Sequence, residues 1–391
     1  MINIKDPKDC CGCTACASIC THDAIMMKPD ALGFLYPHVD TNKCVDCGRC
    51  EKVCQFHDHY NTGENFNKPL AFAARHKNID EVMKSRSGAA FVAISDYILE
   101  QGGVVYGAGY KDHYRVAHKR ATTKEERNEF RGSKYVQSDL TGVFRLVKED
   151  LKKGLSVLFS GTPCQTSGLR AYIGKKLNER LYLMDIVCHS VPSPYIWRDY
   201  INYLESQHHS KICYVNFRDK ELYGWKSHKE TFKFERETEK TSLERKRGSF
   251  TFTSLFTKNI AMRHSCSTCY FTNLHRPSDI TIADYWGWER TDPYFNADNK
   301  GCSLVLCNTE KGKHLFEAIK DRMNVIPAEI KNIMQTHLSK PSEAHPERQA
   351  FEDYYARYGF EKTIRKFGLM GWRKTIHELK KKFLRKLNIF R

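Results

Sequence analysis

The stretch KDCCGCTACASIC, residues 8–20, places five cysteines within thirteen positions. Four of them follow the spacing C-x2-C-x2-C-x3-C, namely Cys10, Cys13, Cys16 and Cys20. The same spacing returns in CVDCGRCEKVC, at Cys44, Cys47, Cys50 and Cys54. Cys11 fits neither copy, because Thr14 stands where a frame starting at Cys11 would need its next cysteine. The repeat predicts that eight thiolates act together and that Cys11 is extra.

Two cysteine runs of this kind hold two [4Fe-4S] clusters, and the fourth cysteine of each run ligates the cluster of the other run. The spacing therefore predicts one cluster on Cys10, Cys13, Cys16 and Cys54 and a second on Cys44, Cys47, Cys50 and Cys20. Zinc is the main alternative, but its sites usually combine two C-x2-C pairs across a long gap. A disulfide framework would need a secreted chain, and the first residues, MINIKDPKD, contain no apolar signal region.

The segment between the two runs carries apolar residues such as Ile25 and Val39 around turn residues, which indicates a short β-hairpin. Residues 1–58 as a whole resemble a bacterial-type 2[4Fe-4S] ferredoxin. Thr21 and Gln55 stand where a proline often follows the fourth cysteine. Proline is not a ligand there, so this difference concerns the loop rather than cluster binding.

The chain has 391 residues, too many for a ferredoxin alone, and this length predicts two or three domains. No apolar run reaches the roughly 18 residues that are needed to span a bilayer. Sixteen cysteines without a signal region indicate a reducing, cytoplasmic compartment. The formal net charge of +17 suggests nucleic acid or anionic lipid as a partner, but bound clusters would cancel about four to six units of it. A nucleic-acid partner is therefore not expected.

The sequence pattern divides the chain into four parts. Residues 1–58 form the cluster module, and the polar segment 59–69 reads as a linker. Residues 70–325 alternate apolar strand-like runs with helical patterns, which is typical of an α/β domain. Residues 326–391 are expected to be mainly helical, basic and peripheral. The predicted fold class is α/β, with an N-terminal ferredoxin-like α+β module followed by a larger α/β domain.

One segment of the large domain combines a strand, a tight turn and a helix. In LSVLFSGTPCQTSGLRAYI, the pattern predicts a strand over 155–159 and a helix over 165–173. Cys164 then lies at the N-terminus of that helix, where free N–H groups stabilise a thiolate or a phosphate. A single cysteine after a turn is nevertheless more often an inert core residue.

Three more cysteines of the large domain stand in suggestive contexts. LYLMDIVCHSVPSP repeats the arrangement, with a strand that ends at Cys188 and His189. RHSCSTCYF supplies a C-x2-C pair, Cys266 and Cys269. The pair alone fits half of a zinc site or a redox pair equally well.

Seven motifs between about residues 70 and 325 resemble, in this order, the coenzyme F420 hydrogenase/dehydrogenase beta-subunit family: SRSGAAF, GGVVYGAGY, FRGSKYVQSDL, FSGTPCQTSGLRAYI, DIVCHSVPSP, SCSTCYF…SDITIADYWG and KGCSLVLCNTEKG. The resemblance implies a flavin, usually FAD, next to a [4Fe-4S] cluster. Members of the family act on different partners, among them the deazaflavin coenzyme F420 and tetrapyrroles. On this chain the resemblance implies a third [4Fe-4S] cluster, with four candidate ligands: Cys164, Cys188, Cys266 and Cys269.

Three segments are candidates for flavin binding. Ser87 is a candidate N-cap of a phosphate-facing helix, although an ordinary cap without a ligand explains it as well. Gly107 and Gly109 lack the third glycine of a dinucleotide fingerprint, so a Rossmann dehydrogenase is not supported. The candidate flavin contacts for phosphate or ring atoms are Ser87, Gly88, Gly132, Ser133, Lys134, Gln137, Gly161 and Thr162.

The sequence therefore predicts an iron–sulfur flavoprotein oxidoreductase. It would move electrons between a one-electron carrier, such as a redox partner protein or ferredoxin, and a two-electron small-molecule substrate or deazaflavin-type coenzyme. The alternative is a non-catalytic electron-transfer subunit that docks on a partner redox enzyme, and a zinc-containing nucleic-acid binder ranks third. No catalytic residue is assigned, because a structural or surface role for His189 is favoured over proton donation. Cys213, Cys302 and Cys307 are expected in the core.

The C-terminal stretch WRKTIHELKKKFLRKLNIFR places four apolar residues near one helical face, Ile376, Leu379, Phe383 and Leu387. Such a basic amphipathic helix fits peripheral membrane contact or an acidic partner. Packing of residues 361–391 on their own domain is slightly favoured.

Overall fold

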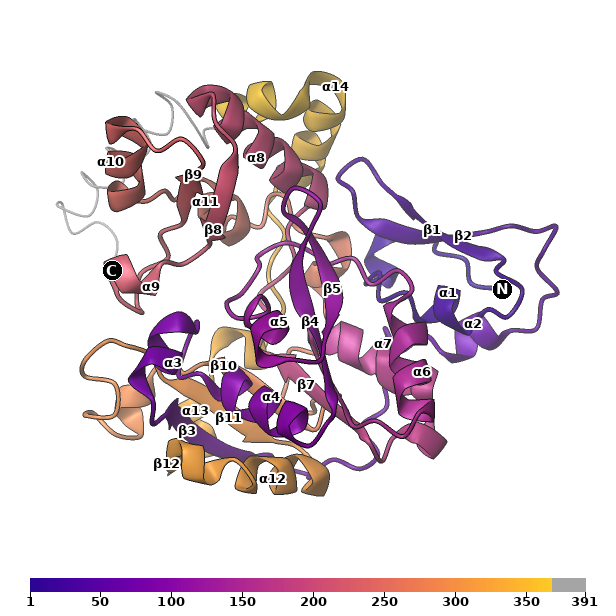
Figure 1. Ribbon diagram of the computed structural model, residues 1–391. Coiled ribbons are helices and arrows are strands. Elements are labelled where there is room, and N and C mark those ends of the chain that lie inside the picture. Colours follow the sequence, from indigo (N-terminus) through magenta and orange to yellow (C-terminus); the bar gives the residue numbers. More distant parts are fainter. Residues whose placement is uncertain (368–391) are drawn as a thin grey trace.

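The computed structural model describes residues 1–367. Its N-terminal module is a small two-stranded sheet surrounded by short helices (Figure 1): η1 (Pro7–Asp9), α1 (Ala15–Ile19), β1 (Ile25–Pro29), β2 (Leu35–Val39) and α2 (Arg49–Lys52). The predicted hairpin is confirmed, with Ile25 opposite Val39 in an antiparallel pair. Asp30 holds its turn, because Oδ1 accepts hydrogen bonds from the amides of Leu32 and Phe34 at 2.9 and 2.8 Å.

The two cysteine runs fold alike. Thr14 precedes α1 and Gly48 precedes α2, and both take the left-handed conformation, with φ of 67° and 68°. Glycine adopts this conformation without cost, whereas a β-branched threonine does so rarely. The repeat in sequence is therefore also a repeat in backbone structure.

The large domain is built on one eight-stranded mixed sheet, in the order β12-β3-β11-β10-β7-β6-β4-β5. Its four central strands β10, β7, β6 and β4 run parallel to one another. The remaining neighbours pair antiparallel. The strands are β3 (Leu70–His76), β4 (Val104–Lys111), β5 (Arg115–Ala121), β6 (Val157–Gly161), β7 (Leu181–Ile186), β10 (Ile280–Asp284), β11 (Ser303–Cys307) and β12 (Met323–Ala328).

Helices cover both faces of this sheet, which confirms the predicted α/β class. Helices α4 and α12 pack on one face and α6 and α7 on the other, each through buried aliphatic and aromatic side chains. Residues of the N-terminal module, among them Ala15 and Val53, belong to the same apolar cluster as α6 and α7. The helices are α3 (Ile79–Lys84), α4 (Ala90–Glu100), α5 (Lys124–Asn128), α6 (Val143–Lys152), α7 (Pro163–Ile173), η2 (Lys175–Leu177), η4 (Trp288–Arg290), α12 (Glu310–Glu317), η5 (Lys320–Arg322), α13 (Ile330–Ile333) and η6 (Thr336–Leu338).

A further group of elements packs beside the carboxyl ends of the central strands, at the top left of Figure 1. Its core is aromatic, and Trp197 and Phe252 are fully buried in it. It consists of α8 (Pro194–His208), β8 (Ile212–Asn216), α9 (Lys220–Tyr223), β9 (Thr231–Phe234), α10 (Glu239–Arg247), α11 (Thr251–Thr257), η3 (His264–Thr268) and α14 (Arg348–Lys366), which is kinked at Gly359.

Three expectations about the large domain need correction. Cys302 and Cys307 are buried as expected, but Cys213 is exposed, because a register shift between Ile212 and Tyr214 turns its side chain outward. Strand β12 crosses the boundary suggested at residue 325, so the sheet continues into the presumed extension. The segment 59–69 is irregular but not free, because Tyr60 is buried and donates a hydrogen bond to Asn273 Oδ1 at 3.1 Å.

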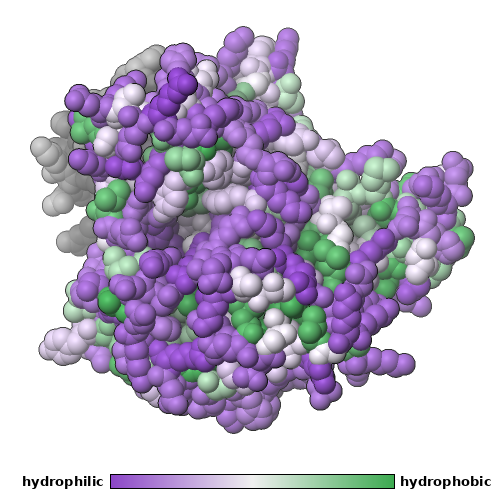
Figure 2. Space-filling view, in the orientation of Figure 1, coloured by the Kyte–Doolittle hydropathy of each residue, from purple (hydrophilic) through white to green (hydrophobic). Residues whose placement is uncertain are grey.

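The described surface is mostly hydrophilic on the visible face. Its hydrophobic areas gather on the N-terminal module and around its junction with the large domain (Figure 2). Within residues 1–367, no helix combines the length and the apolar character that crossing a membrane requires. The basic amphipathic segment predicted near the C-terminus, residues 372–391, lies outside the described residues.

Candidate functional site

The thiols of the N-terminal module lie close together, and the predicted ligand sets divide them into a proximal and a distal group. In the proximal group, burial raises the pKa of Cys16, and the charges of Cys13, Cys10 and Cys54 raise it further. Burial likewise raises the pKa of Cys54 to about 11, with Cys13, Cys10 and Cys50 as charged neighbours. We call the predicted set Cys10, Cys13, Cys16 and Cys54 the proximal group.

The distal group lies at the outer end of the module. A small, almost wholly apolar cavity there is lined by Ala24, Ile25 and Val39 together with the four remaining cysteines of the two runs, Cys20, Cys44, Cys47 and Cys50. Cys47 is exposed to solvent, and the amide of Ile2 donates to Cys50 Sγ at 3.2 Å. The distal group thus faces the surface, whereas the proximal group faces the large domain.

The large-domain group is Cys164, Cys188, Cys266 and Cys269. Burial raises the pKa of Cys188, and its charged neighbours include Cys266, Cys164 and Cys269. Burial also raises the pKa values of Cys266 and Cys269 to about 12. The structure thus brings together four cysteines from three distant parts of the sequence. In the part of the chain that the structure describes, no three His, Cys, Asp or Glu side chains converge closely enough to hold a single metal ion.

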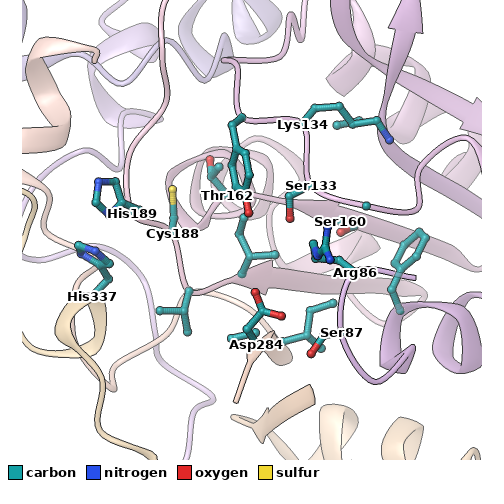
Figure 3. Close-up of a pocket in the computed structure, with 18 of the residues that line it drawn as sticks. Arg86, Ser87, Ser133, Lys134, Ser160, Thr162, Cys188, His189, Asp284 and His337 are labelled. Carbon is teal, nitrogen blue, oxygen red and sulfur yellow. The ribbon is translucent and has the colours of Figure 1, made fainter. Parts of the chain in front are cut away.

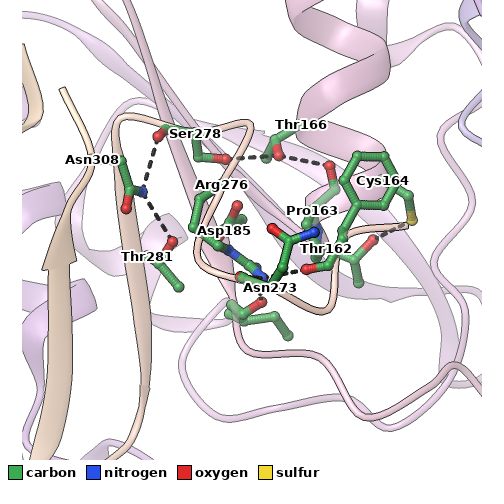
Figure 4. Close-up of polar contacts among 12 residues, drawn as sticks. Thr162, Pro163, Cys164, Thr166, Asp185, Asn273, Arg276, Ser278, Thr281 and Asn308 are labelled. Carbon is green, nitrogen blue, oxygen red and sulfur yellow. Dashed lines mark hydrogen bonds and ion pairs between the residues drawn. The ribbon is translucent and has the colours of Figure 1, made fainter. Parts of the chain in front are cut away.

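A buried hydrogen-bond network fixes the loops that carry these four cysteines (Figure 4). Arg276 forms an ion pair with Asp185 at 2.9 Å and donates to the carbonyls of Phe271 and Ile186. This joins the loop after Cys269 to the end of β7, just before Cys188. Ser278 donates to Thr166, and Thr166 donates to the Pro163 carbonyl at the start of α7.

Cys11, the extra cysteine of the first run, lies between the proximal group and the large-domain group. Its buried thiol is within hydrogen-bonding reach of the thiols of Cys13 and Cys164. Phe56, Tyr60 and Phe271 complete an apolar cluster around these sulfur atoms. The two groups therefore meet across a junction that is shielded from water.

The structure has a cavity of about 680 Å³ at the carboxyl ends of the central parallel strands (Figure 3). Ligands of open α/β sheets bind at this edge. Six of the eight predicted flavin contacts line it: Ser87, Gly132, Ser133, Lys134, Gly161 and Thr162.

The other two predicted flavin contacts lie outside the cavity lining. Gln137 bridges the two domains instead, because Nε2 donates to the Cys11 carbonyl and Oε1 accepts from Arg263, both at 2.9 Å. Gly88 packs against β3, where an added Cβ would meet the Ala74 carbonyl at 2.3 Å. We therefore assign no flavin contact to Gln137 or Gly88.

Two of the lining residues have other contacts than expected. Ser87 is not an N-cap, because α4 begins further on with Ala89 as its cap, and Ser87 Oγ donates to the Cys302 carbonyl. Lys134 lines the cavity with its stem, while its ammonium points away and donates to the carbonyls of Glu129 and Arg131 (Figure 3). Burial lowers the pKa of Lys134 to about 7.

One end of the cavity carries a cation that the sequence reasoning missed. Arg86 lines the cavity, and its Nε and Nη2 atoms are shielded from solvent without a hydrogen-bond partner in the described residues. Burial, with a smaller effect of the nearby Arg218, lowers the pKa of Arg86 to about 10. Ser133 also lines the cavity. Because buried polar groups normally have partners, this end is suited to an anion such as a flavin phosphate. The signal in the sequence was the arginine inside SRSGAAF.

The opposite end of the cavity carries Cys188, His189 and His337 (Figure 3). The two imidazole rings are 4.4 Å apart, and burial lowers the pKa of His189 and brings that of His337 to about 4. His189 Nε2 lies 2.8 Å from Asn259 Oδ1. Both rings are therefore neutral at pH 7. Cys188 belongs both to the cavity wall and to the large-domain group.

Comparisons with known proteins give two matches along the chain. Residues 154–332 match the family described as the C terminus of the coenzyme F420 hydrogenase/dehydrogenase beta subunit, and residues 9–57 match the 4Fe-4S dicluster domain. A chain of the F420-reducing [NiFe] hydrogenase complex from Methanosarcina barkeri, studied as a xenon derivative, has a similar structure, with 17% sequence identity and a TM-score of 0.43. The alignment covers 76% of this chain and 91% of that one. A comparison with curated proteins gave no match.

Proposed function

We propose, for a chain that joins a 4Fe-4S dicluster domain to a C-terminal domain of the coenzyme F420 hydrogenase/dehydrogenase beta-subunit family, the function of an iron–sulfur flavoprotein oxidoreductase. It moves electrons between a one-electron carrier and a two-electron organic substrate or coenzyme. One observation supports this function above all: Cys188 lies in the wall of the cavity and in the large-domain thiol group at once.

The residues present fit the groups that this function requires. The proximal, distal and large-domain groups would each hold one [4Fe-4S] cluster through four thiolates. FAD would lie in the cavity with its phosphates near Arg86 and Ser133, because Nε and Nη2 of Arg86 are shielded from solvent and have no hydrogen-bond partner among the described residues. When bound, a flavin exchanges electrons singly with clusters and in pairs with organic substrates.

In the proposed electron path, the three groups follow one another from the surface to the cavity. The distal group is at the surface, the proximal group faces the large domain, and the large-domain group adjoins the cavity. Cys11, Phe56 and Phe271 exclude water where the two inner groups meet. At the cavity wall, His118 Nε2 donates to the Ser160 carbonyl, since a carbonyl can only accept, so Nδ1 accepts from Ser138. This neutral network provides a polar wall without adding charge.

A second candidate function is a relay subunit without its own substrate reaction. Exposed apolar side chains around the distal group favour it. Val45, which follows Cys44 in the sequence, is 59% exposed, and Met26 is 61% exposed. Such an apolar surface fits a redox partner protein. The same surface serves the enzyme as the place where its electron carrier docks.

Anaerobic purification of the full chain, followed by quantification of iron, sulfide and FAD, tests the proposal. We expect three four-iron clusters and one FAD per chain, and substrate-dependent flavin bleaching when two-electron donors are screened. Clusters without FAD, and no turnover with any small molecule, would favour the relay subunit. Colourless protein without iron would overturn both functions.

A further inference from the structure

Arg263 joins the N-terminal module to the large domain. It immediately precedes η3, and its side chain is fully buried. Nε donates to the Cys10 carbonyl at 2.8 Å and Nη2 to the Leu35 carbonyl at 3.0 Å, both in the module. Nη1 donates to Gln137 Oε1 at 2.9 Å in the large domain. A Cβ at Gly12 would lie only 2.8 Å from Nη1, so the cysteine run closes tightly over the guanidinium.

The charge of Arg263 has no carboxylate partner in residues 1–367. The five other arginines that are less than about 9% exposed each lie within ion-pair distance of a carboxylate, in the pairs Arg127–Asp96, Arg218–Asp284, Arg276–Asp185, Arg348–Glu352 and Arg170–Asp279. Asp30, which feels the charge of Arg263 weakly, uses its carboxylate on the turn amides of the hairpin. A buried charge is costly unless an anion is near it.

The anions that can fill this role are thiolates. Nη2 lies 3.5 Å from Cys10 Sγ, which belongs to the proximal group. The ring of Tyr36 lies 4.3 Å from the guanidinium carbon and contributes a cation–π contact. The Arg263 carbonyl also accepts the Cys266 amide at 3.1 Å, so the same residue fixes the backbone of the large-domain group.

We propose that Arg263 is the positive counter-charge of the cluster held by Cys10, Cys13, Cys16 and Cys54, and that it raises the reduction potential of this cluster. The proposal rests on the proposed function, because it requires that the proximal group holds a cluster. One-electron reduction makes a cluster one unit more negative without forming a bond or taking up a proton. A fixed cation at the cluster favours the reduced form, as nearby charge and hydrogen bonds to sulfur are known to do.

The consequence is a preferred direction of electron transfer within the module. The distal group has no comparable buried cation among the described residues, since Arg145, which reaches the carbonyl of Cys20, is exposed and paired with Asp23 at 2.7 Å. The large domain therefore makes the inner cluster the better electron acceptor of the two. An electron that arrives at the exposed end of the module is drawn toward the cavity only while the module is docked.

Redox titration with dithionite, followed by EPR on the anaerobic full-length protein, tests this role. In Arg263→Gln, an uncharged side chain that keeps a donor for the carbonyls, we expect the proximal cluster to be at least tenfold harder to reduce, a shift of about 59 mV for one electron. Arg263→Lys retains the charge and should shift much less. Arg145→Gln is the matched control and should leave the proximal potential unchanged. Loss of the distal signal in Cys47→Ser assigns the signals.

The outcomes separate this inference from the proposed function. Wild-type protein without clusters would contradict the function itself. Clusters present in Arg263→Gln with unchanged potentials would overturn the role of Arg263. If Arg263→Gln fails to assemble the proximal cluster while Arg263→Lys assembles it, the charge is required by the cluster, which supports the inference. Equal loss of that cluster in both variants would reduce Arg263 to a packing role and overturn it.

Discussion

Cys11 is the fifth cysteine of a run in which four follow the cluster spacing, and the structure gives it a place of its own. Its equivalent in the second run is Val45, which is exposed, whereas Cys11 is buried against Cys13 and Cys164. The difference follows from docking, because Cys11 lies against the large domain whereas Val45 lies at the outer end of the module. A thiol at this position fills the junction between two thiol groups with a small, weakly polar side chain.

Replacement of Cys11 by alanine should therefore leave the iron and sulfide content unchanged, at a cost in stability of about 1 kcal/mol for the lost packing. Cys13→Ala is the matched change at a predicted ligand, and it should remove one four-iron cluster. Chemical analysis of iron per chain measures both. If Cys11→Ala lost as much iron as Cys13→Ala, Cys11 would be a ligand and the frame would have to be reassigned.

Arg86 is the residue on which the flavin proposal can be tested most directly. Hydrogen bonds to charged groups contribute about 1.5–3 kcal/mol, so Arg86→Ala should weaken FAD binding by roughly 10- to 100-fold. Titration of flavin-free protein with FAD, followed by fluorescence quenching, measures the change. Arg145→Ala, which removes an arginine that contacts the module and does not line the cavity, is the control. If Arg86→Ala binds FAD as tightly as the wild type, the FAD phosphates do not bind at this end of the cavity.

The strand–turn–helix that carries Cys164 shows how well a local sequence pattern predicts secondary structure. The sequence predicted a strand over 155–159 and a helix from Gln165, and the structure has β6 over Val157–Gly161 and α7 from Pro163. The helix starts earlier because proline is well tolerated at the first helical position. Thr162 closes a capping box with Gln165, a signature that a sequence reader can find.

Other parts of the site could not be predicted, because they arise from packing between distant segments. Nothing periodic in the sequence places His337 opposite His189, or buries Arg263 against the carbonyl of Cys10. Gln137 was a candidate for the flavin because it is close in sequence to Lys134, yet in space it reaches the module instead. The grouping of the eight N-terminal cysteines rests on their spacing in the sequence and stays a prediction.

Helix α7 makes a testable contact with the module through Gly168. In a helix interior, Gly→Ala normally stabilises by about 0.8–1.0 kcal/mol. Here an added Cβ would lie 2.7 Å from Cys13 Sγ, so the module or the helix must move. We expect Gly168→Ala to lower the melting temperature and to reduce occupancy of the proximal cluster, the reverse of the effect of helix propensity.

Thermal unfolding of the anaerobic protein and its EPR spectrum check this prediction. Gly63→Ala is a suitable control, because its Cβ would meet only Asn61 Oδ1, at 3.4 Å. An increase in melting temperature for Gly168→Ala, with all clusters retained, would mean that α7 and the cysteine run are not in close contact.

The molecule as a whole combines two units whose resemblance to known families was confirmed by both matches along the chain. The hairpin tip and the first cysteine run of the module both dock on the large domain, through Leu32 and Cys10, whose carbonyls accept from Ser193 and Arg263. The second cysteine run makes no such contact among the hydrogen bonds of the described residues. This asymmetry leaves the outer end of the module without such contacts and fixes its inner end on the large domain.

Because the distal group lies at the free end, Cys47→Ser should act locally. We expect the loss of one four-iron cluster, a third of the iron, with FAD content, proximal and large-domain EPR signals and folding stability close to wild type. Reduction of the flavin by a small two-electron donor should also persist, while electron exchange with a protein carrier should slow strongly, because the carrier would have to reach a buried cluster. Cys213→Ser, an exposed cysteine far from the three groups in sequence, is the control for handling of a surface thiol. Loss of FAD together with the distal cluster would contradict this arrangement, since it would mean that the N-terminal module and the large domain fold as a single unit.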